Sequence, residues 1–366
     1  MTPRRTGATR LVAVVAAAAA RRDDAGAATD DDVASQPAPL SRSAVLRRLV
    51  APSLAAALLA PAVAAAAAQG ATATAAAAAP AASPRALRPP ELAALRAAFA
   101  AAAPKSKAPV LLRLVFHDAG TFDRAAGDGG ANGSVRLELD RPENGGLKRG
   151  WRVIEATRRE LEKQAAASGG GGSGGLGGGG GGNAAKTAAA TTAGQAAAGL
   201  ASLLSDGDLI ALAGAHAVEV TGGPADLLGR VRVGRADAAT PDPAGRLPSE
   251  DSAPAALVAA FEAMSLSAGE MVALSGAHTL GTKGFGDPVT FDNSYYTTLL
   301  ARPWDDPKTP MPTMIGLPSD RMLPGDARCL AAIERYARDQ ALFFGDFSDA
   351  YVRLTELGAS WRPLGA

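Results

Sequence analysis

Apolar residues recur every three or four positions over most of the chain, and the alternation typical of strands is scarce. Residues 91–102 follow a Pro-Pro pair and are typical of an amphipathic helix. The run at 110–119 is short and mostly apolar, so its pattern alone leaves helix and strand open. Further helices are expected at residues 145–164, 206–220, 267–278, 326–344 and 347–357. The pattern predicts a mainly α fold, with one domain at 87–366 and loops rich in Gly and Pro.

A low-complexity segment interrupts this pattern. Residues 168–183 are almost all Gly, and an Ala- and Thr-rich tract follows them. Such a composition offers little to a packed core. No Gly-Lys-Ser/Thr sequence follows the glycines, which argues against a phosphate-binding loop. Residues 166–199 are therefore expected to form a flexible insert.

The first part of the chain has the composition of a targeting sequence. Residues 1–86 are rich in Arg, Ala, Thr and Ser and contain no Glu and no aromatic residue. Arg47 and Arg48 precede an apolar stretch at 49–68, which is typical of a twin-arginine export signal. Two prolines and the many alanines in this stretch argue against a transmembrane helix. Two consecutive signals predict a chloroplast protein of the stroma or the thylakoid lumen, with no stable membrane span after processing.

Charge and cysteine content exclude several classes of protein. The chain has 37 basic and 36 acidic side chains, so its formal net charge is only +1. This balance excludes a strongly basic nucleic-acid-binding protein. Cys329 is the only cysteine, which excludes an intrachain disulfide and a thiolate zinc cluster. A zinc hydrolase needs its His and carboxylate ligands at close spacing, and no two of the three histidines are near each other in the sequence.

Arg113 and His117 are four residues apart, so on a helix they lie on one face. A buried guanidinium is costly unless other groups compensate its charge. Two interpretations of this pair are open from the spacing alone. Either the Arg points to solvent beside a His at the helix end, or the two side chains share a chemical task.

His216 and His278 lie in two similar segments, LIALAGAHAVEV and MVALSGAHTLGT. Each segment places its histidine at the C-terminal end of an apolar helix. The helix pattern does not distinguish a functional histidine from a structural one.

Six motifs occur in an order that narrows these alternatives. They are LLRLVFHDAGTF (111–122), GGANGSVRLELDRPENGGL (129–147), VEVTGGP (218–224), ALSGAHTLG (273–281), FDNSYY (291–296) and LPSD (317–320). Together they resemble the plant-type haem peroxidases of class I, and in particular the plastid ascorbate-peroxidase-related subgroup. The resemblance covers about residues 88–361, apart from the insert. The secreted branch of the family requires disulfides, so the single cysteine excludes it.

The resemblance implies a haem-peroxidase-like helical fold, with haem b between a distal and a proximal helix. On the distal side, it implies that His117 is the base that moves a proton between the two oxygens of hydrogen peroxide. Arg113 is implied to be the fixed cation that stabilises charge as the O–O bond breaks. Asn132 matches the residue that bonds the other nitrogen of this histidine.

On the proximal side, the resemblance implies that His278 is the axial ligand of the haem iron. Asp320 matches the carboxylate that hydrogen-bonds this histidine. Ser275 occupies the position where the family contacts a haem propionate. His216 is then expected to be a partly buried structural residue.

The sequence also departs from ascorbate peroxidase in the haem pocket and the donor site. Phe116 replaces a distal Trp, and the loop after Gly281 lacks the arginine that contacts ascorbate. This shorter loop also lacks the proximal Trp, which leaves Phe285 as the nearest aromatic replacement. Lys105 aligns with a lysine of the ascorbate site. Two further residues, Thr279 and Asp292, match part of a monovalent cation site, such as one for potassium.

The predicted function is a haem b peroxidase that reduces hydrogen peroxide with a small organic electron donor. The alternative is a haem-less peroxidase-like structural protein of the thylakoid lumen. A packing scaffold needs none of Arg113, His117, Asn132, His278 and Asp320, which all stand at the family's catalytic positions. Their presence favours the enzyme.

Overall fold

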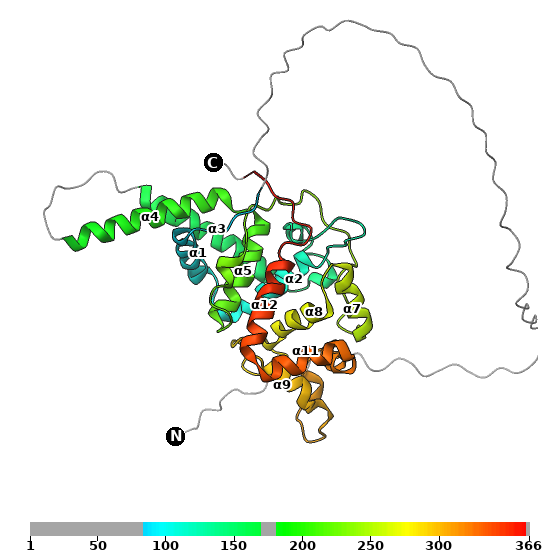
Figure 1. Ribbon diagram of the computed structural model, residues 1–366. Helices are drawn as coiled ribbons and strands as arrows, with labels where there is room; N and C mark the ends of the chain where they lie inside the picture. Colours follow the sequence, from blue (N-terminus) through cyan, green and yellow to red (C-terminus); the bar gives the residue numbers. More distant parts are fainter. Residues whose placement is uncertain (1–82, 170–180, 364–366) are drawn as a thin grey trace, which may run out of the picture. The chain divides into compact units, whose positions relative to one another are not determined.

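The described part of the chain is built almost entirely from helices. A computed structural model describes residues 83–169 and 181–363, and Figure 1 shows them in the colours of the sequence. Within these ranges the only β pairing consists of three isolated bridges, so the prediction of a mainly α fold is confirmed. The α-helices are α1 (Pro89–Ala102), α2 (Ala108–Ala119), α3 (Lys148–Gly169), α4 (Gly181–Leu203), α5 (Asp206–Val220), α6 (Leu227–Arg230), α7 (Pro254–Ala263), α8 (Ala268–Ser275), α9 (Ser294–Ala301), α10 (Pro318–Met322), α11 (Ala327–Arg338) and α12 (Gln340–Leu354).

Several helix ends differ from the expected ones; the helix expected at 145–164, for example, is α3 at Lys148–Gly169. The α-helical part of α8 stops at Ser275, and a 3-10 turn over Gly276–Thr279 carries His278. The expected break between 344 and 347 is wrong, because α11 and α12 meet at Asp339. The carboxylate of Asp339 accepts a hydrogen bond from the backbone N–H of Leu342 at 2.9 Å and thereby caps α12. The run at 110–119 is helical and lies within α2.

The prediction of a flexible insert at 166–199 is wrong for most of its described residues. These residues continue α3 to Gly169 and form most of α4, while 170–180 lie outside the described residues. Alanine has the highest helix propensity, so an Ala-rich tract readily forms a helix once one face is buried. Ala197 and Leu200 are fully buried in α4, and the helix packs against α1 and α3.

Helix α5 is the central helix of the domain, because every residue from Gly207 to Val218 is buried. It packs against α2, and Gly214 allows the two helices to come close. A Cβ atom at Gly214 would lie 2.2 Å from the hydroxyl oxygen of Tyr351 in α12 and 2.6 Å from Cγ2 of Val115 in α2, so a larger residue would clash with both helices. The small residue therefore helps to fix the position of α2, which carries Arg113 and His117.

A buried ion pair joins the start of α5 to the loop before α7. The side chains of Asp208 and Arg235 are both fully buried, and Nη1 of Arg235 lies 2.9 Å from Oδ1 of Asp208. The Arg235 guanidinium also donates to the carbonyl oxygens of Arg232 and Thr355. These hydrogen bonds join three segments of the chain: the start of α5, the segment at 232–235 and the residue after α12, Thr355.

The folded domain begins slightly earlier than residue 87. Arg85 pairs with Val233 through two backbone hydrogen bonds and forms an ion pair of 2.8 Å with the buried Glu91. Residues 1–82 lie outside the described residues, and with them the expected twin-arginine signal and its apolar stretch. Among the residues that the structure describes, no single helix has the length and apolar character to cross a membrane, and one bent pair, Pro254–Ala263 with Ala268–Thr279, passes on length and composition alone.

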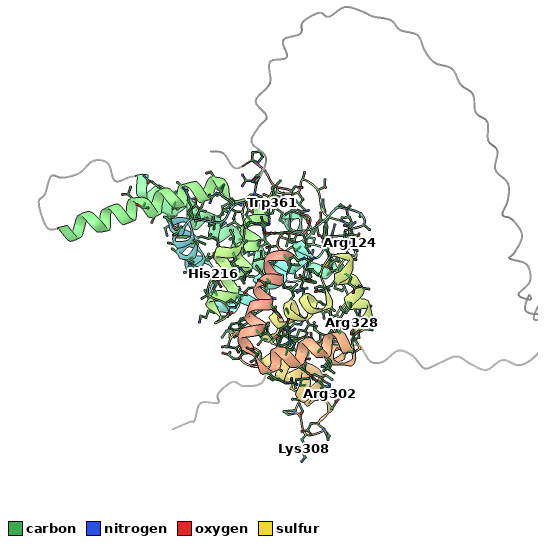
Figure 2. The ribbon with its side chains drawn as sticks, in the orientation of Figure 1. Arg124, His216, Arg302, Lys308, Arg328 and Trp361 are labelled. Atoms are coloured by element: carbon green, nitrogen blue, oxygen red, sulfur yellow. The ribbon has the colours of Figure 1, made fainter. Side chains whose placement is uncertain are left out.

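His216 is a buried residue of α5, as expected of a structural histidine. Its side chain stacks on Phe99 with ring centroids 4.8 Å apart, and neither ring nitrogen has a hydrogen-bond partner. Figure 2 shows His216 within the body of the domain, whereas Arg302 and Lys308 project from it. Burial, and to a smaller extent the charge of Arg96, lowers the pKa of His216 to about 4.

This histidine makes the stability of the domain dependent on pH. A pKa lower in the folded than in the unfolded state means that the unfolded chain binds the proton more tightly. Stability is therefore expected to fall as the pH drops from about 6.5 to 4, and His216 accounts for about 3 kcal/mol of the loss at pH 4. Denaturant titrations of wild type and His216→Leu at pH 7 and pH 4 measure this contribution. An equal loss in both proteins would contradict it.

Candidate active site

Helix α2 presents Arg113 and His117 on one face, as their spacing predicts. Nε of Arg113 donates to Nε2 of His117 at 3.2 Å, and its two terminal nitrogens donate to the carbonyl oxygens of Glu143 and Gly145 at 2.8 Å each. The guanidinium is thus fixed by three hydrogen bonds and held against the imidazole. This geometry favours the pair over an Arg that points away into solvent.

The second ring nitrogen of His117 is held by Asn144. Nδ1 of His117 lies 2.7 Å from Oδ1 of Asn144, and Nδ2 of the same amide donates to the carbonyl oxygen of Glu138 at 2.9 Å. Because that donation fixes the orientation of the amide, Oδ1 faces the ring and Nδ1 carries the proton. Nε2 of His117 is left with a lone pair. Burial is the main cause that lowers the pKa of His117 to about 4, so the ring is neutral above this pH.

The prediction that Asn132 bonds this histidine is wrong. Nδ2 of Asn132 donates to Asp242 at 3.1 Å, and its Oδ1 accepts from the backbone of Ser134 at 2.9 Å. Asn132 lies in a turn with Gly133 at φ +75°, and the buried Asp118 accepts from the backbone of Gly133. Asn144 lies in the same long motif. Both Asn132 and Asn144 precede a Gly, so the sequence offered Asn144 as a candidate as well. Spacing alone could not choose between the two asparagines.

The predicted pair on the other side is confirmed in its geometry. Nδ1 of His278 lies 2.9 Å from Oδ1 of Asp320, and Oδ2 of Asp320 accepts from the backbone N–H of Leu317 at 2.8 Å. Burial by itself lowers the pKa of His278, but the Asp320 carboxylate outweighs it and raises the pKa above its usual value. Burial by itself raises the pKa of Asp320, but His278 and the hydrogen bonds lower it overall.

Tyr295, which was not among the predicted site residues, completes this group. Its hydroxyl donates to Oδ1 of Asp320 at 2.8 Å, and its ring meets the His278 ring edge-on with centroids 6.0 Å apart. Phe285 is buried and packs on Tyr295 with centroids 4.7 Å apart. The expected aromatic replacement is thus present near the pair, but Tyr295 makes the polar contact. The FDNSYY motif contained this residue, and nothing in its spacing gave the direction of its hydroxyl.

The other predicted site residues lie around these two groups. Phe116 stacks on Phe261 at 5.8 Å and meets the ring of His117 edge-on. The hydroxyl of Ser275 donates to the carbonyl oxygen of Met271 at 2.8 Å, within its own helix. A hydrogen bond of 3.0 Å joins Thr279 to Asp292, so the two residues proposed for a cation are in contact.

His117 and His278 lie near one another in the fold. The charge of Glu250 acts to raise the pKa of both histidines, although burial lowers that of His117 overall, so both imidazoles lie within its electrostatic reach. Helix α2 also contacts the 3-10 turn that carries His278. The His278 side chain is 41% exposed, although its neighbours Gly276 and Thr279 are buried. The ring of His278 is therefore accessible although the residues around it in the turn are buried.

These residues fit a haem. The Asp320 hydrogen bond occupies Nδ1 of His278 and leaves Nε2 available as a ligand atom. An imidazole oriented by a carboxylate is a typical axial ligand of haem iron. Helix α2, which contacts the turn that carries His278, holds a neutral imidazole and a fixed guanidinium, a donor set suited to a small polar molecule such as a peroxide.

Comparisons with known proteins also indicate a peroxidase. A family model described as peroxidase matches residues 92–169 and 187–339. The chain is 41% identical over 260 residues to "Putative L-ascorbate peroxidase 6" of Arabidopsis thaliana, covering 71% of this chain and 67% of that protein. It is 34% identical to "L-ascorbate peroxidase 1, cytosolic" of Oryza sativa subsp. indica, covering 70% of this chain and 88% of that protein. "L-ascorbate peroxidase 5, peroxisomal" of Arabidopsis thaliana is 33% identical, with 69% and 76% covered.

Proposed function

The chain belongs to the peroxidase family, as a plant-type class I haem peroxidase that reduces hydrogen peroxide, and we propose that Arg113, His117 and Asn144 form its peroxide-cleaving group. The observation that carries this proposal is the set of hydrogen bonds that fixes all three side chains around Nε2 of His117. The one lone pair of the His117 ring, at Nε2, accepts a hydrogen bond from Nε of Arg113, so the accepting atom and the cation lie side by side.

Haem b, when bound to His278, supplies the iron that binds peroxide and takes up its two oxidising equivalents. His117 would accept a proton at Nε2 from one oxygen of peroxide and deliver it to the other, which would leave as water. The Arg113 guanidinium would stabilise the negative charge that develops on the leaving oxygen. Asn144 keeps the proton on Nδ1, so that Nε2 stays the accepting atom. Asp320 orients His278 in the same way on the other side.

Asn144 is expected to matter for this step, and Asn132 is not. Asn144→Leu removes the acceptor that orients His117, and the loss of such a supporting hydrogen bond costs about 10- to 100-fold in activity. Stopped-flow measurement of the rate of reaction with peroxide, per bound haem, gives the effect. The matched control is Asn132→Leu, whose partner is Asp242. A rate that falls in Asn132→Leu and not in Asn144→Leu would contradict the assignment.

The electron donor is proposed to be a small organic molecule. Relatives that carry ascorbate in their names make ascorbate one candidate. The resemblance also implies that the short loop after Gly281 lacks the arginine that contacts ascorbate. We therefore expect a simple phenol such as guaiacol to be oxidised at least as fast as ascorbate.

The purified, haem-loaded protein tests the proposal. Its haem absorbance is expected to change on adding hydrogen peroxide and to return when a donor is added, and His278→Ala is expected to lose the haem. Steady-state rates with ascorbate and guaiacol then rank the donors. A colourless protein that cannot take up haem would contradict the enzyme and favour the structural alternative.

Two finer assignments also belong to this proposal. A monovalent cation such as potassium at Thr279 and Asp292 is testable by the change in activity and haem absorbance when potassium is removed. Import into chloroplasts through residues 1–86 is testable by fusing this segment to a fluorescent protein. Fluorescence that stays in the cytosol would contradict a plastid destination.

A further inference from the structure

Three of the four tyrosines in the chain form a continuous line of aromatic rings that starts at His278. The centroid distances are 6.0 Å from His278 to Tyr295, 5.0 Å from Tyr295 to Tyr296 and 5.1 Å from Tyr296 to Tyr336. Each of the three tyrosines is at most 2% exposed. The line therefore runs through the core from the proximal side of the active site.

The first and the last tyrosine of the line each have a carboxylate as proton acceptor. The hydroxyl of Tyr295 donates to Asp320, and that of Tyr336 donates to Oδ2 of Asp346, each at 2.8 Å. The middle hydroxyl, on Tyr296, donates only to the carbonyl oxygens of Val272 and Ala273. A carboxylate can take up a proton, whereas a peptide carbonyl is a far weaker base.

This difference controls where an electron can be removed. Burial, aided by the charge of Asp320, raises the pKa of Tyr295 well above its usual value, so the ring is a neutral phenol. A neutral phenol gives up an electron readily only when its proton leaves at the same time. Tyr295 and Tyr336 can pass that proton to a bonded carboxylate, while Tyr296 can serve only as a short-lived intermediate.

We propose that Tyr295, Tyr296 and Tyr336 form an electron-transfer path that connects the proximal side of the active site to the surface at Asp346. The proposal rests on the peroxidase function proposed above. The side chain of Asp346 is 37% exposed, so the last tyrosine is one hydrogen bond away from solvent. An electron donor too large to enter the active site could then be oxidised at this end.

Electrons and protons balance along the path. Reduction of one hydrogen peroxide to two waters takes two electrons and two protons. Tyr295 supplies one of these electrons, and its phenolic proton moves to Asp320. The phenoxyl radical on Tyr295 then takes an electron from Tyr336 through Tyr296 and recovers its proton from Asp320. Tyr336, having passed its own proton to Asp346, is restored by a one-electron donor at the surface, and a second donor molecule supplies the other electron.

No other described side chain in contact with Tyr295 offers the same chemistry. Its aromatic neighbours are His278, Tyr296 and Phe285, and Phe285 has no ionisable proton and is much harder to oxidise. The three tryptophans lie on other segments, with Trp151 hydrogen-bonded to Glu155 in α3, Trp304 against Arg321, and Trp361 against Arg232 and Arg235.

Electron paramagnetic resonance tests the path. Haem-loaded protein is mixed with one equivalent of hydrogen peroxide without donor, frozen, and examined for a tyrosyl radical. Growth on ring-deuterated tyrosine narrows such a signal and assigns it. We expect the signal in wild type and its loss in Tyr295→Phe. The control is Tyr351→Phe, which removes the fourth tyrosine, whose hydroxyl donates to Ala211; this variant is expected to keep the signal.

The absorbance of the same samples separates this inference from the function it rests on. A normal change in haem absorbance without a tyrosyl signal, or with an equal signal in Tyr295→Phe, would overturn the path alone. No change in absorbance on adding peroxide would overturn the peroxidase function and the path together.

A second variant tests the surface end without touching the active site. Tyr336→Phe is expected to slow oxidation of a phenol attached to dextran at least tenfold and to leave oxidation of free guaiacol unchanged. Equal rates with the dextran-bound phenol in Tyr336→Phe and wild type would overturn the surface end of the path.

Discussion

His117→Leu is expected to slow the reaction with hydrogen peroxide by about 10²- to 10⁴-fold, the range for loss of a positioned general base. Nε2 of His117 is the one nitrogen of the distal group that carries a lone pair, because Asn144 binds Nδ1 and the Arg113 nitrogens all donate. Leucine fills a similar volume and cannot accept a proton. Haem should remain bound, since His278 lies on the other side. Stopped-flow absorbance, with haem content measured in parallel, gives the rate per active site.

The pH dependence provides an independent check on this base. The pKa of His117 is lowered to about 4, chiefly by burial. The wild-type rate should therefore be constant above pH 5 and fall about tenfold per unit below pH 4, where the protonated ring can no longer accept a proton. His117→Leu should lack this acid limb. The same limb in both proteins, or an unchanged rate at pH 7, would show that another group is the base.

The control for this prediction is Arg113→Leu. It removes the cation and keeps the imidazole with its Asn144 contact. Its rate should fall by about 10²- to 10³-fold, as for the loss of an oriented group that stabilises developing charge. The acid limb should remain, because His117 still titrates. The two variants thus separate proton transfer from charge stabilisation.

Local periodicity predicted the parts of the site that lie on one helix. Residues four apart on a helix share a face whatever the rest of the fold does, so Arg113 and His117 were correctly paired. The His278–Asp320 pair spans 42 residues, and only the order of the family motifs connected its members. The direction of a loop side chain follows neither rule. Asn132 was therefore chosen over Asn144, and the hydroxyl of Tyr295 was missed.

Composition misled the fold prediction in one region. The residues from 184 to 199 are mostly Ala and Thr, and a flexible segment was expected because small side chains bury little area. The contacts of α4 with α1 and α3 supply the buried surface that a stretch of small side chains does not provide by itself. A neighbouring surface that buries one face is enough to stabilise a helix of good propensity. Sequence periodicity cannot reveal that surface, because it belongs to other helices.

Breaking the buried pair of Asp208 and Arg235 is expected to destabilise the domain by about 3–5 kcal/mol, the usual cost of leaving one buried charge without its partner. In Asp208→Leu, the fully buried Arg235 retains only carbonyl acceptors from Arg232 and Thr355. Equilibrium unfolding in urea measures the loss. The double variant Asp208→Leu with Arg235→Leu should cost less than the sum of the single variants, because it leaves no unpaired charge.

An exposed pair provides the matched control for this buried one. Arg338 and Glu334 are 3.3 Å apart on α11, with side chains 74% and 43% exposed. Water screens such a pair, so Arg338→Leu should cost under about 1 kcal/mol. Both variants lose one Arg–carboxylate contact, and Arg235→Leu also loses the buried hydrogen bonds to Arg232 and Thr355, so the difference measures the buried group as a whole. Similar losses in Arg235→Leu and Arg338→Leu would show that the buried pair does not stabilise the contact between α5 and the loop before α7.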